Sequence, residues 1–300
     1  DEQLNSWLNK EKLAINTLKS VGSLMYEKGI ELILFRRHLL EIGASELMNF
    51  ISYANNVVGR ENNIETINIL SEEMLKMNLA PCKVDIGLLT AEFIESNSSN
   101  ANKFLLNKLS HIIDKKNAPR KAKDVILYGF GRIGRLAARE LIKQAGKGQQ
   151  LRLKAIVVRN LSNEQIIKRA DLLRTDSVHG AFKGVVDVDL NNQSIIVNGQ
   201  KIKFINGNQP ANIDYTIHDI KDALLIDNTG AFTDKESLSL HLKSKGVNKV
   251  LLTAPGKEIP NIVYGINSQN LDIENINIFS AASCTTNCIA PILHIVEKKY

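Results

Sequence analysis

Cysteine is scarce in this sequence, and its scarcity excludes two common kinds of site. The chain has 300 residues and three cysteines, Cys82, Cys284 and Cys288. An odd number of cysteines without Cys-x-x-Cys spacing argues against a disulfide framework and against a zinc site. We therefore expect reduced thiols and no bound metal.

Long apolar runs and aromatic residues are also few. No stretch approaches the length of a membrane-spanning helix, and the start, Asp1-Glu2-Gln3, lacks the charged and then apolar pattern of a secretory signal. Aromatic residues make up 5% of the chain, and the basic residues behind its net charge of +6 are spread along it. That distribution argues against a nucleic-acid surface. These absences predict a cytoplasmic protein that binds neither membrane nor nucleic acid.

Residues 1–117 are predicted to form an all-α N-terminal extension. Their apolar residues recur at spacings of three and four, beginning with Leu4, Trp7 and Leu8, and this spacing produces one apolar helix face. His38 and Cys82 have no partners at catalytic spacing, so we expect ordinary surface and core residues there. We assign the extension no chemistry of its own. A basic linker follows at residues 115–123, and the pattern of apolar residues changes after it.

After the linker, short apolar runs alternate with helical stretches. The runs are residues 125–128, 153–158, 224–227 and 249–253. Residues 132–144 and 235–243 have helical spacing, and Asn198-Gly199 is a hairpin signal between two alternating segments. Strands alternating with helices predict the α/β class, with a Rossmann-type doubly wound parallel sheet over residues 118–283.

A glycine-rich turn after the first run carries a candidate site. It reads Gly129, Phe130, Gly131, Arg132, Ile133 and Gly134. In a G-x-G-x-x-G turn between strand and helix, the glycines permit a tight bend, close approach of a pyrophosphate and close helix packing. The N–H groups at the helix start then hold the phosphates. A turn chosen only for packing is the alternative, but the flanking strand and helix favour binding of NAD or NADP.

The residues after the second strand bear on which dinucleotide is used. An NAD site usually has an acidic residue there to receive the ribose hydroxyls, whereas this strand is followed by Arg159 and Asn160. Asn160 could hydrogen-bond a ribose without repelling a 2′-phosphate, and Arg159 could pair with that phosphate unless it points into solvent. The sequence therefore favours NADP or use of both cofactors.

Cys284 lies where an alternating segment passes into a stretch of helical spacing. A helix N-terminus stabilises an anion, which favours the nucleophilic thiolate of a cysteine placed there. Backbone N–H groups of such a turn could also stabilise an oxyanion formed on attack. We therefore predict that Cys284 is a nucleophile. Cys288 lies one helical turn later among apolar neighbours, and we expect it to be a small core residue.

Five motifs together resemble the phosphorylating glyceraldehyde-3-phosphate dehydrogenase family, over about the last three fifths of the chain. In order they are residues 128–135 (YGFGRIGR), 176–180 (DSVHG), 228–233 (NTGAFT), 253–257 (TAPGK) and 282–287 (ASCTTN). The resemblance implies that Cys284 attacks D-glyceraldehyde 3-phosphate to give a thiohemiacetal, and that hydride passes to the nicotinamide. Inorganic phosphate would then release 1,3-bisphosphoglycerate from the thioester.

The resemblance also implies roles for individual residues. Ser283 and Thr285 match positions near the substrate. The positions that match cofactor contacts are the glycine turn with Arg132 and Ile133, then Thr229, Gly230, Phe232 and Thr253. Family members are commonly cytoplasmic homotetramers of glycolysis or gluconeogenesis, so the same is expected here.

The sequence departs from the family pattern at two places. One is the part of the cofactor site that would bind adenosine, and the other is the catalytic histidine that would act as a base. Asn160 replaces an acid, and Asn208-Gln209 stand where the family has an Arg before Pro210. None of the histidines matches the family's catalytic one, since His294 lies about 15 Å along the helix from Cys284, and His179 belongs to the 176–180 motif. We therefore expect residues 284–300 to be the first helix of an α+β catalytic domain that is truncated in this sequence.

Two other functions stay open on the sequence alone. The same cysteine chemistry would suit oxidation of erythrose 4-phosphate, and a chain that ended at Tyr300 could bind a dinucleotide without catalysis. The extension resembles that of a longer subgroup of the family. Partner binding, regulation and assembly are all compatible with it.

Overall fold

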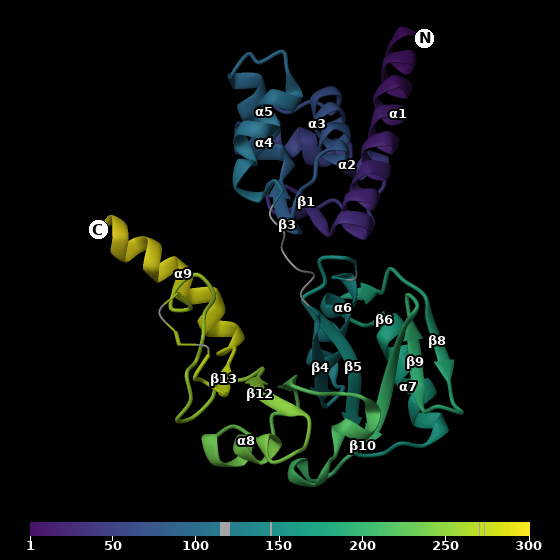
Figure 1. Ribbon diagram of the computed structural model, residues 1–300, viewed down its shortest axis with the longest axis vertical. Coiled ribbons are helices and arrows are strands. Elements are labelled where there is room, and N and C mark those ends of the chain that lie inside the picture. The colour runs from purple at the N-terminus through teal and green to yellow at the C-terminus, as the bar shows by residue number, and fades with distance from the viewer. Residues whose placement is uncertain (115–120, 145, 270, 273) are drawn as a thin grey trace. The chain divides into compact units, whose positions relative to one another are not determined.

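The computed structural model of the protein describes residues 1–114, 121–144, 146–269, 271–272 and 274–300 (Figure 1). The chain divides into two compact units. The N-terminal unit is Asp1–Lys121 with Ala145–Gln149, and the dinucleotide unit is Ala122–Gln144 with Gln150–Tyr300. Residues 115–120, which hold most of the basic linker and the predicted boundary between residues 117 and 118, lie outside the described residues.

Helices make up most of the N-terminal unit. They are α1 (Glu2–Ser23), α2 (Ala44–Tyr53), α3 (Ile64–Lys76), α4 (Ile86–Glu95) and α5 (Ala101–Lys108), with π-helical turns at Leu24–Lys28 and Ala54–Val58 and a 3₁₀ turn at Ser110–Ile112. Side chains of Asn63, Asp85 and Asn100 cap α3, α4 and α5 by accepting a backbone N–H. Such caps satisfy donors that the first helical turn leaves free.

A small sheet in the N-terminal unit corrects the prediction that this part is all-α. β1 (Ile30–Leu34) pairs antiparallel with β2 (Arg37–His38) and parallel with β3 (Cys82–Asp85). Ile30, Leu32 and Leu34 are buried while the residues between them are less so. This is a period of two, so the five-residue run satisfies a half-buried strand better than a helix face.

Apolar side chains from the helices and from β1 close one core in this unit. The fully buried ones include Ala14, Leu24, Ile30, Leu34, Leu47, Ile67, Leu70 and Met74. Cys82 lies half-buried beside this core, as predicted, and exposed His38 pairs with Glu31 through Nδ1.

The dinucleotide unit is built on an eight-stranded sheet of order β13-β12-β11-β4-β5-β10-β9-β8. The strands are β4 (Lys123–Tyr128), β5 (Leu151–Val158), β8 (Val186–Asp189), β9 (Ser194–Val197), β10 (Gln200–Asn206), β11 (Ala223–Asp227), β12 (Val247–Leu252) and β13 (Ile278–Ser280). The first six strands in this order are parallel, and β8, β9 and β10 are joined antiparallel. The predicted Rossmann-type parallel sheet is confirmed.

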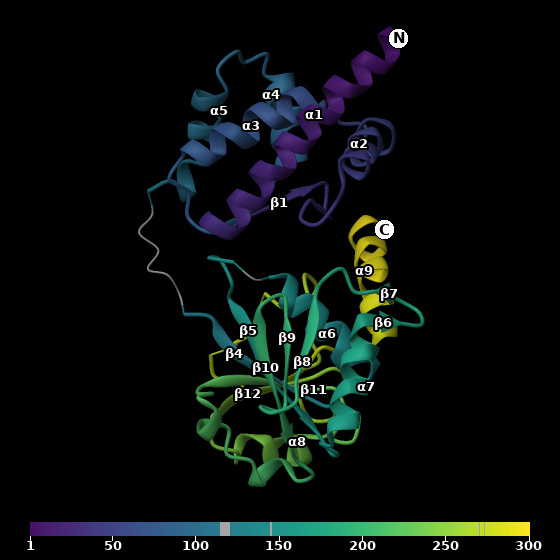
Figure 2. The same cartoon turned by 90° about the vertical axis from the view of Figure 1, so that its right-hand side faces the viewer.

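Helices α6 (Arg132–Lys143), α7 (Asn163–Arg174) and α8 (Lys235–Leu242) cover the two faces of this sheet. The unit also contains α9 (Cys284–Lys299), 3₁₀ turns at Pro210–Asn212 and Tyr215–His218, and a two-stranded ribbon of β6 (Thr175–Asp176) and β7 (Gly180–Ala181). Val125 and Leu127 of β4 join the core of α6 and α7, which lie on one side of the sheet in Figure 2. Ile126 and Tyr128 join the opposite core. Burial on both faces explains why β4 is apolar throughout.

The strand order places a topological switch point between β4 and β11. From β4 the chain moves to β5 on one side, and it later returns to β11 on the other side of β4. In open α/β sheets a crevice forms at such a point, outside the carboxyl ends of the strands. No helix among the described residues is long and apolar enough to cross a membrane.

Candidate active site

The glycine turn lies at the switch point, between the end of β4 and the start of α6. A Cβ added to Gly134 would lie 2.5 Å from the carbonyl oxygen of Gly129, so only glycine lets α6 approach the turn this closely. At Gly129, φ is +90° and an added Cβ would lie 2.8 Å from Cγ2 of Thr229. Gly131 differs, because nothing lies within 4 Å of its added Cβ. The first and third glycines serve packing, and the second leaves open space.

The start of α6 is equipped to bind an anion. Its N-cap is Gly131, which provides no side-chain hydrogen bond, whereas Ser162, Asp234 and Ser283 cap α7, α8 and α9. The first N–H groups of α6 therefore keep their donor capacity, and the helix dipole adds partial positive charge. With the open space at Gly131, these groups fit the pyrophosphate of a dinucleotide.

Arg132 and Ile133, which lie between the second and third glycines of the turn, are both exposed. The Phe130 side chain is buried, and its ring packs edge-on against Phe204 with centroids 5.9 Å apart. Phe130 can therefore meet a cofactor only through its backbone.

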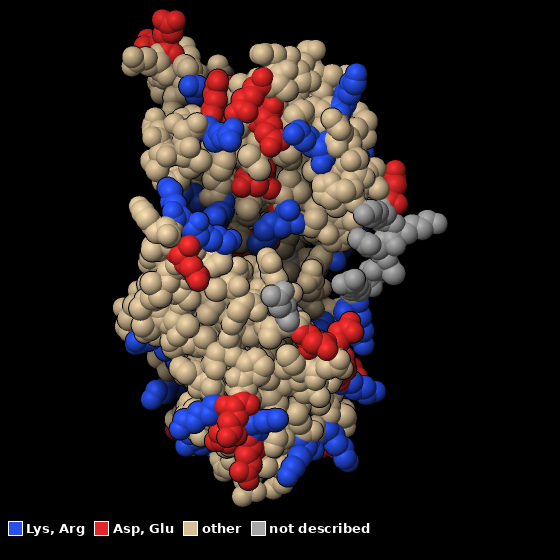
Figure 3. Space-filling model, turned by 90° about the vertical axis from the view of Figure 1, so that its left-hand side faces the viewer, with Lys and Arg blue, Asp and Glu red and all other residues tan. Residues whose placement is uncertain are grey.

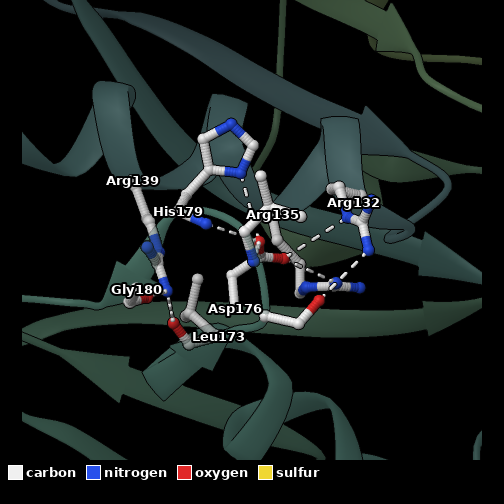
Figure 4. A network of polar contacts seen from close by, with 9 residues as sticks. Arg132, Arg135, Arg139, Leu173, Asp176, His179 and Gly180 are labelled. Atoms are coloured by element: carbon white, nitrogen blue, oxygen red, sulfur yellow. Dashed lines mark hydrogen bonds and ion pairs between the residues drawn. The ribbon is translucent and has the colours of Figure 1, made fainter.

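A buried carboxylate holds the arginines of α6 (Figure 4). Asp176, from β6, accepts the backbone N–H groups of Val178 and His179, both at 3.0 Å, and pairs with Arg135 at 3.2 Å and with Arg132 at 3.7 Å. The N–H groups of His179 and Val178, in that order, together with the His179 ring and Arg135, lower the pKa of Asp176 well below its usual range. Asp176 therefore stays ionised and holds the side chain of Arg132 at the start of α6.

Arg139 and His179 complete this network. Arg139 donates to the carbonyl oxygens of Leu173, at 2.7 and 3.2 Å, and of Gly180, at 3.1 Å. His179 Nδ1 lies 3.1 Å from Asp176. No contact between described residues joins His179 to Cys284, so the 176–180 motif orients α6 and supplies no base in this structure.

The turn after β11 forms the other wall of the crevice. Thr229 donates its backbone N–H and its hydroxyl to Oδ1 of Asp227, at 2.8 and 2.7 Å. Gly230 follows with φ of +69°, in the left-handed region that favours glycine. Thr253 donates its hydroxyl to the carbonyl oxygen of Asp227 at 3.0 Å. Gly129, Thr229 and Thr253, predicted separately from the sequence, are thus gathered around Asp227.

Phe232 lies half-buried behind this turn. Its ring meets Tyr128 and His241 edge-on, with centroid distances of 6.2 and 5.4 Å. The ring therefore packs against the end of β4 and against α8, and the contact of Phe232 with the cofactor stays a prediction.

The carboxyl ends of β5 and β10 carry no acidic side chain. Arg159 and Asn160 are exposed directly after β5, and Asn208 and Gln209 are exposed after β10. Burial raises the pKa of Tyr128, the last residue of β4, and the positive charge of the Arg159 guanidinium opposes this rise. This edge of the sheet is neutral to basic where an adenosine ribose would lie.

Cys284 is the first residue of α9 and is exposed. Ala282, two residues earlier, is buried with φ of +58°, a strained value for a residue other than glycine. The Ser283 hydroxyl caps α9 by accepting the N–H of Thr286 at 2.9 Å, and Asn287 donates to the carbonyl oxygen of Ala281 at 2.7 Å. The turn is therefore held from both sides with its thiol facing outward. Ser283 is occupied as a cap, while Thr285 is exposed.

Cys288 is exposed, and the prediction that it is a core residue is wrong. α9 buries none of its residues, and Ile292, Leu293 and Ile295 are more than half exposed on it. Apolar neighbours in sequence produce burial only where another element covers them, and within the described residues no element covers this helix.

Sequence reasoning missed Asp227 and His241. Both side chains are fully buried, and Nε2 of His241 lies 2.9 Å from Oδ2 of Asp227. The available signals were an acid at the end of an apolar strand, just before Asn228, and a histidine inside the helical stretch of α8. Neither signal reveals that the two side chains meet. Across the described part of the chain, no group of three or more acidic, histidine or cysteine side chains could hold a metal ion.

Known proteins resemble this chain in the same region. Residues 123–235 match the family described as glyceraldehyde 3-phosphate dehydrogenase, NAD binding domain. A glyceraldehyde-3-phosphate dehydrogenase of Monascus purpureus is 38% identical over 174 residues, which are 58% of this chain and 48% of that protein. One from Mycoplasma pneumoniae is 36% identical over 185 residues, 61% of this chain and 51% of that protein.

A longer match comes from a glyceraldehyde-3-phosphate dehydrogenase-like protein of Pseudomonas aeruginosa. It is 47% identical over 239 residues, which are 79% of this chain and 51% of that protein. This alignment is longer than the stretch from Lys123 to Tyr300, so it reaches into the N-terminal unit. The chain spans about half the length of the curated relatives it matches. With the sheet order, the glycine turn and these matches in agreement, the chain belongs to the glyceraldehyde-3-phosphate dehydrogenase family.

Proposed function

We propose that the protein to which this chain belongs catalyses phosphorylating oxidation of D-glyceraldehyde 3-phosphate with NAD or NADP. The observation that carries the proposal is that the dinucleotide crevice and Cys284 share one edge of one sheet. β4, β11, β12 and β13 are parallel neighbours, so the turns that follow them all lie at their carboxyl ends. Those turns contain Gly131, Thr229, Thr253 and Cys284.

The chemistry follows from an exposed thiol at a helix start. The thiolate of Cys284 attacks the aldehyde carbon, so that a carbon–sulfur bond forms and the carbonyl oxygen takes up a proton. A bound nicotinamide supplies the acceptor for the hydride that leaves this carbon, and the oxygen then loses its proton to give a thioester. Phosphate oxygen attacks the thioester carbon, the carbon–sulfur bond breaks, and Cys284 leaves as thiolate with the acyl phosphate released.

NADP or dual cofactor use is the finer part of the proposal. Its support is the edge formed by Arg159, Asn160, Asn208 and Gln209, where no carboxylate would repel a 2′-phosphate. Arg159 is exposed and so is available for such a phosphate. The family description names NAD, and NAD binding is compatible with the same edge because an amide can hydrogen-bond ribose hydroxyls.

We also propose a division of labour along the chain. Residues 118–283 would bind the dinucleotide, residues 284–300 would be the first helix of a catalytic domain, and residues 1–117 would be an extension of unassigned role. Figure 3 shows the side on which α9 lies in Figure 1, and broad areas of the dinucleotide unit there carry no charged side chains. Ile292, Leu293 and Ile295 of α9 offer exposed apolar surface, which suits coverage by such a domain.

Replacement of the nucleophile tests the proposal. In the full-length protein, Cys284→Ser should lower phosphorylating oxidation by at least about a thousandfold, because a hydroxyl is a far weaker nucleophile at neutral pH. Affinity for the dinucleotide should stay within about twofold, since the site of the pyrophosphate is untouched. Steady-state rates and titration of intrinsic fluorescence measure the two quantities.

Cys288→Ser is the matched control, because Cys288 is also an exposed cysteine and lies one turn later on α9. Its activity should match that of the unaltered protein. Turnover retained by Cys284→Ser would exclude Cys284 as the nucleophile.

A further inference from the structure

A buried histidine and aspartate lie directly behind the cofactor-facing turn of β11. Asp227 ends the strand, His241 comes from α8, and both side chains are fully buried. Burying two ionisable groups costs free energy unless each finds partners. The contacts of Asp227 and His241 must therefore offset the free-energy cost of burying them.

The side chain of Asp227 directs its hydrogen bonds at this turn and at α8. Oδ1 accepts the N–H and the hydroxyl of Thr229, and Oδ2 lies 2.9 Å from Nε2 of His241. A carboxylate only accepts, so the proton on this contact belongs to His241. The carbonyl oxygen of Asp227 accepts the hydroxyl of Thr253 at 3.0 Å. Asp227 thus ties the turn after β11 to the end of β12.

The His241 side chain has a single polar contact among the described residues. Its Nδ1 has no hydrogen-bond partner, and its ring is flanked by the rings of Tyr128 and Phe232 at centroid distances of 4.7 and 5.4 Å. An apolar side chain would fill such an aromatic cage without leaving a buried nitrogen unpaired. The hydrogen bond to Asp227 is therefore what a histidine adds at this position.

The contacts continue to the glycine turn. Cγ2 of Thr229 occupies the space that a Cβ on Gly129 would need, 2.8 Å away, and Asn228 donates its N–H to the carbonyl oxygen of Tyr128 at 2.8 Å. A shift of Asp227 would therefore move Thr229 relative to Gly129, and so would change the width of the crevice.

We propose that His241 is a positioning residue for dinucleotide binding: it fixes Asp227, which fixes Thr229 at the wall of the crevice. This inference rests on the proposed function, because it takes the crevice to be the dinucleotide site. It predicts that loss of the His241 hydrogen bond weakens dinucleotide binding although His241 itself never touches the ligand.

Three variants of the full-length protein test the inference. His241→Leu keeps an apolar side chain in the cage and removes the donor, His241→Gln restores an N–H donor, and Leu238→Ala weakens the packing of the same helix without touching Asp227. Leu238 is fully buried and belongs to α8, so it reports what a loss of packing alone does. Dissociation constants for NADH and NADPH are measured by fluorescence, beside thermal unfolding and kcat.

His241→Leu should raise the dissociation constant about tenfold, because a buried carboxylate oxygen loses its partner and the turn relaxes. His241→Gln should recover affinity to within about threefold, and Leu238→Ala should lower the unfolding midpoint with affinity within about twofold. Unchanged affinity in His241→Leu overturns the inference, as does an equal loss of affinity in Leu238→Ala. Failure of the unaltered protein to bind either dinucleotide would instead contradict the proposed function.

Discussion

The two units of this chain bury different kinds of polar side chain. Among the described residues of the N-terminal unit, the buried polar side chains are all neutral, as in Thr17 and Asn68. The dinucleotide unit buries ionisable groups, among them Asp176, Asp227 and His241. Neutral groups cost less to bury, so they suffice where the task is packing. Asp176 and Asp227 are buried beside the turns of the crevice, where their strong hydrogen bonds hold those turns in place.

Gly22 of the N-terminal unit contrasts with two glycines of the dinucleotide turn. An added Cβ meets nothing within 4 Å at Gly22, which lies in α1, whereas at Gly129 and Gly134 it meets the opposite wall or the turn itself. Gly129 and Gly134 are therefore required by the geometry of the turn. Gly22 only raises the entropy lost on folding.

The largest expected contrast is between the thiols of the two units. Burial raises the pKa of Cys82 to about 11, so little of this thiol is ionised at pH 8. The labelling rate of Cys82 should therefore increase as the pH is raised toward its pKa. Cys284 is exposed at a helix N-terminus, and iodoacetamide should label it about a hundredfold faster than Cys82 at pH 8. Mass spectrometry of timed digests measures each rate.

Cys288 supplies the internal control for that experiment. It is exposed like Cys284 but lies in the second turn of α9, so it should react more slowly than Cys284 and faster than Cys82. Equal rates for Cys284 and Cys288 would mean that exposure alone decides reactivity.

Glycine substitutions should separate packing from binding. Gly131→Ala should leave the fold stable and weaken dinucleotide binding about fiftyfold, because its Cβ projects into the open space meant for a pyrophosphate. Gly134→Ala should instead lower the free energy of unfolding by about 1–3 kcal/mol through overlap with the backbone. Urea unfolding and fluorescence titration measure the two effects.

The N-terminal unit provides the matched substitution. Gly22→Ala should raise the free energy of unfolding by about 0.5–1 kcal/mol and leave binding unchanged. If Gly131→Ala behaved like Gly22→Ala in both urea unfolding and fluorescence titration, the glycine turn would serve packing only and would not bind phosphate.

The smallest expected effect concerns cofactor choice. Arg159→Leu should raise the KM for NADP about tenfold and change that for NAD less than about twofold, since only NADP offers a 2′-phosphate to pair with. Arg60→Leu removes one charge from the N-terminal unit, where Arg60 pairs with Glu95 at 2.7 Å, and should change neither constant. An NAD preference of about a hundredfold or more in the unaltered protein would contradict the NADP proposal.

Local patterns allowed much of this structure to be predicted. The strand, glycine turn and helix from Lys123 to Lys143 lie close to where apolar runs and helical spacing put them, and Cys284 begins a helix after a strand as expected. Such features depend on residues that are neighbours in sequence. The N-terminal helices followed from the same periodicity, but the five residues of β1 were too short a run to distinguish a strand from a helix face.

What the sequence alone determined is therefore the order of the elements and the chemistry at their ends: a dinucleotide turn, then a thiol at a helix start. Tertiary structure decided which distant residues meet. Arg135 contacts Asp176, which lies 41 residues away in sequence, and His241 contacts Asp227, which lies 14 residues away. Neither spacing is one from which a contact could be predicted. It also decided that Cys288 is exposed, because burial depends on what packs over a helix and not on the apolar character of its own residues.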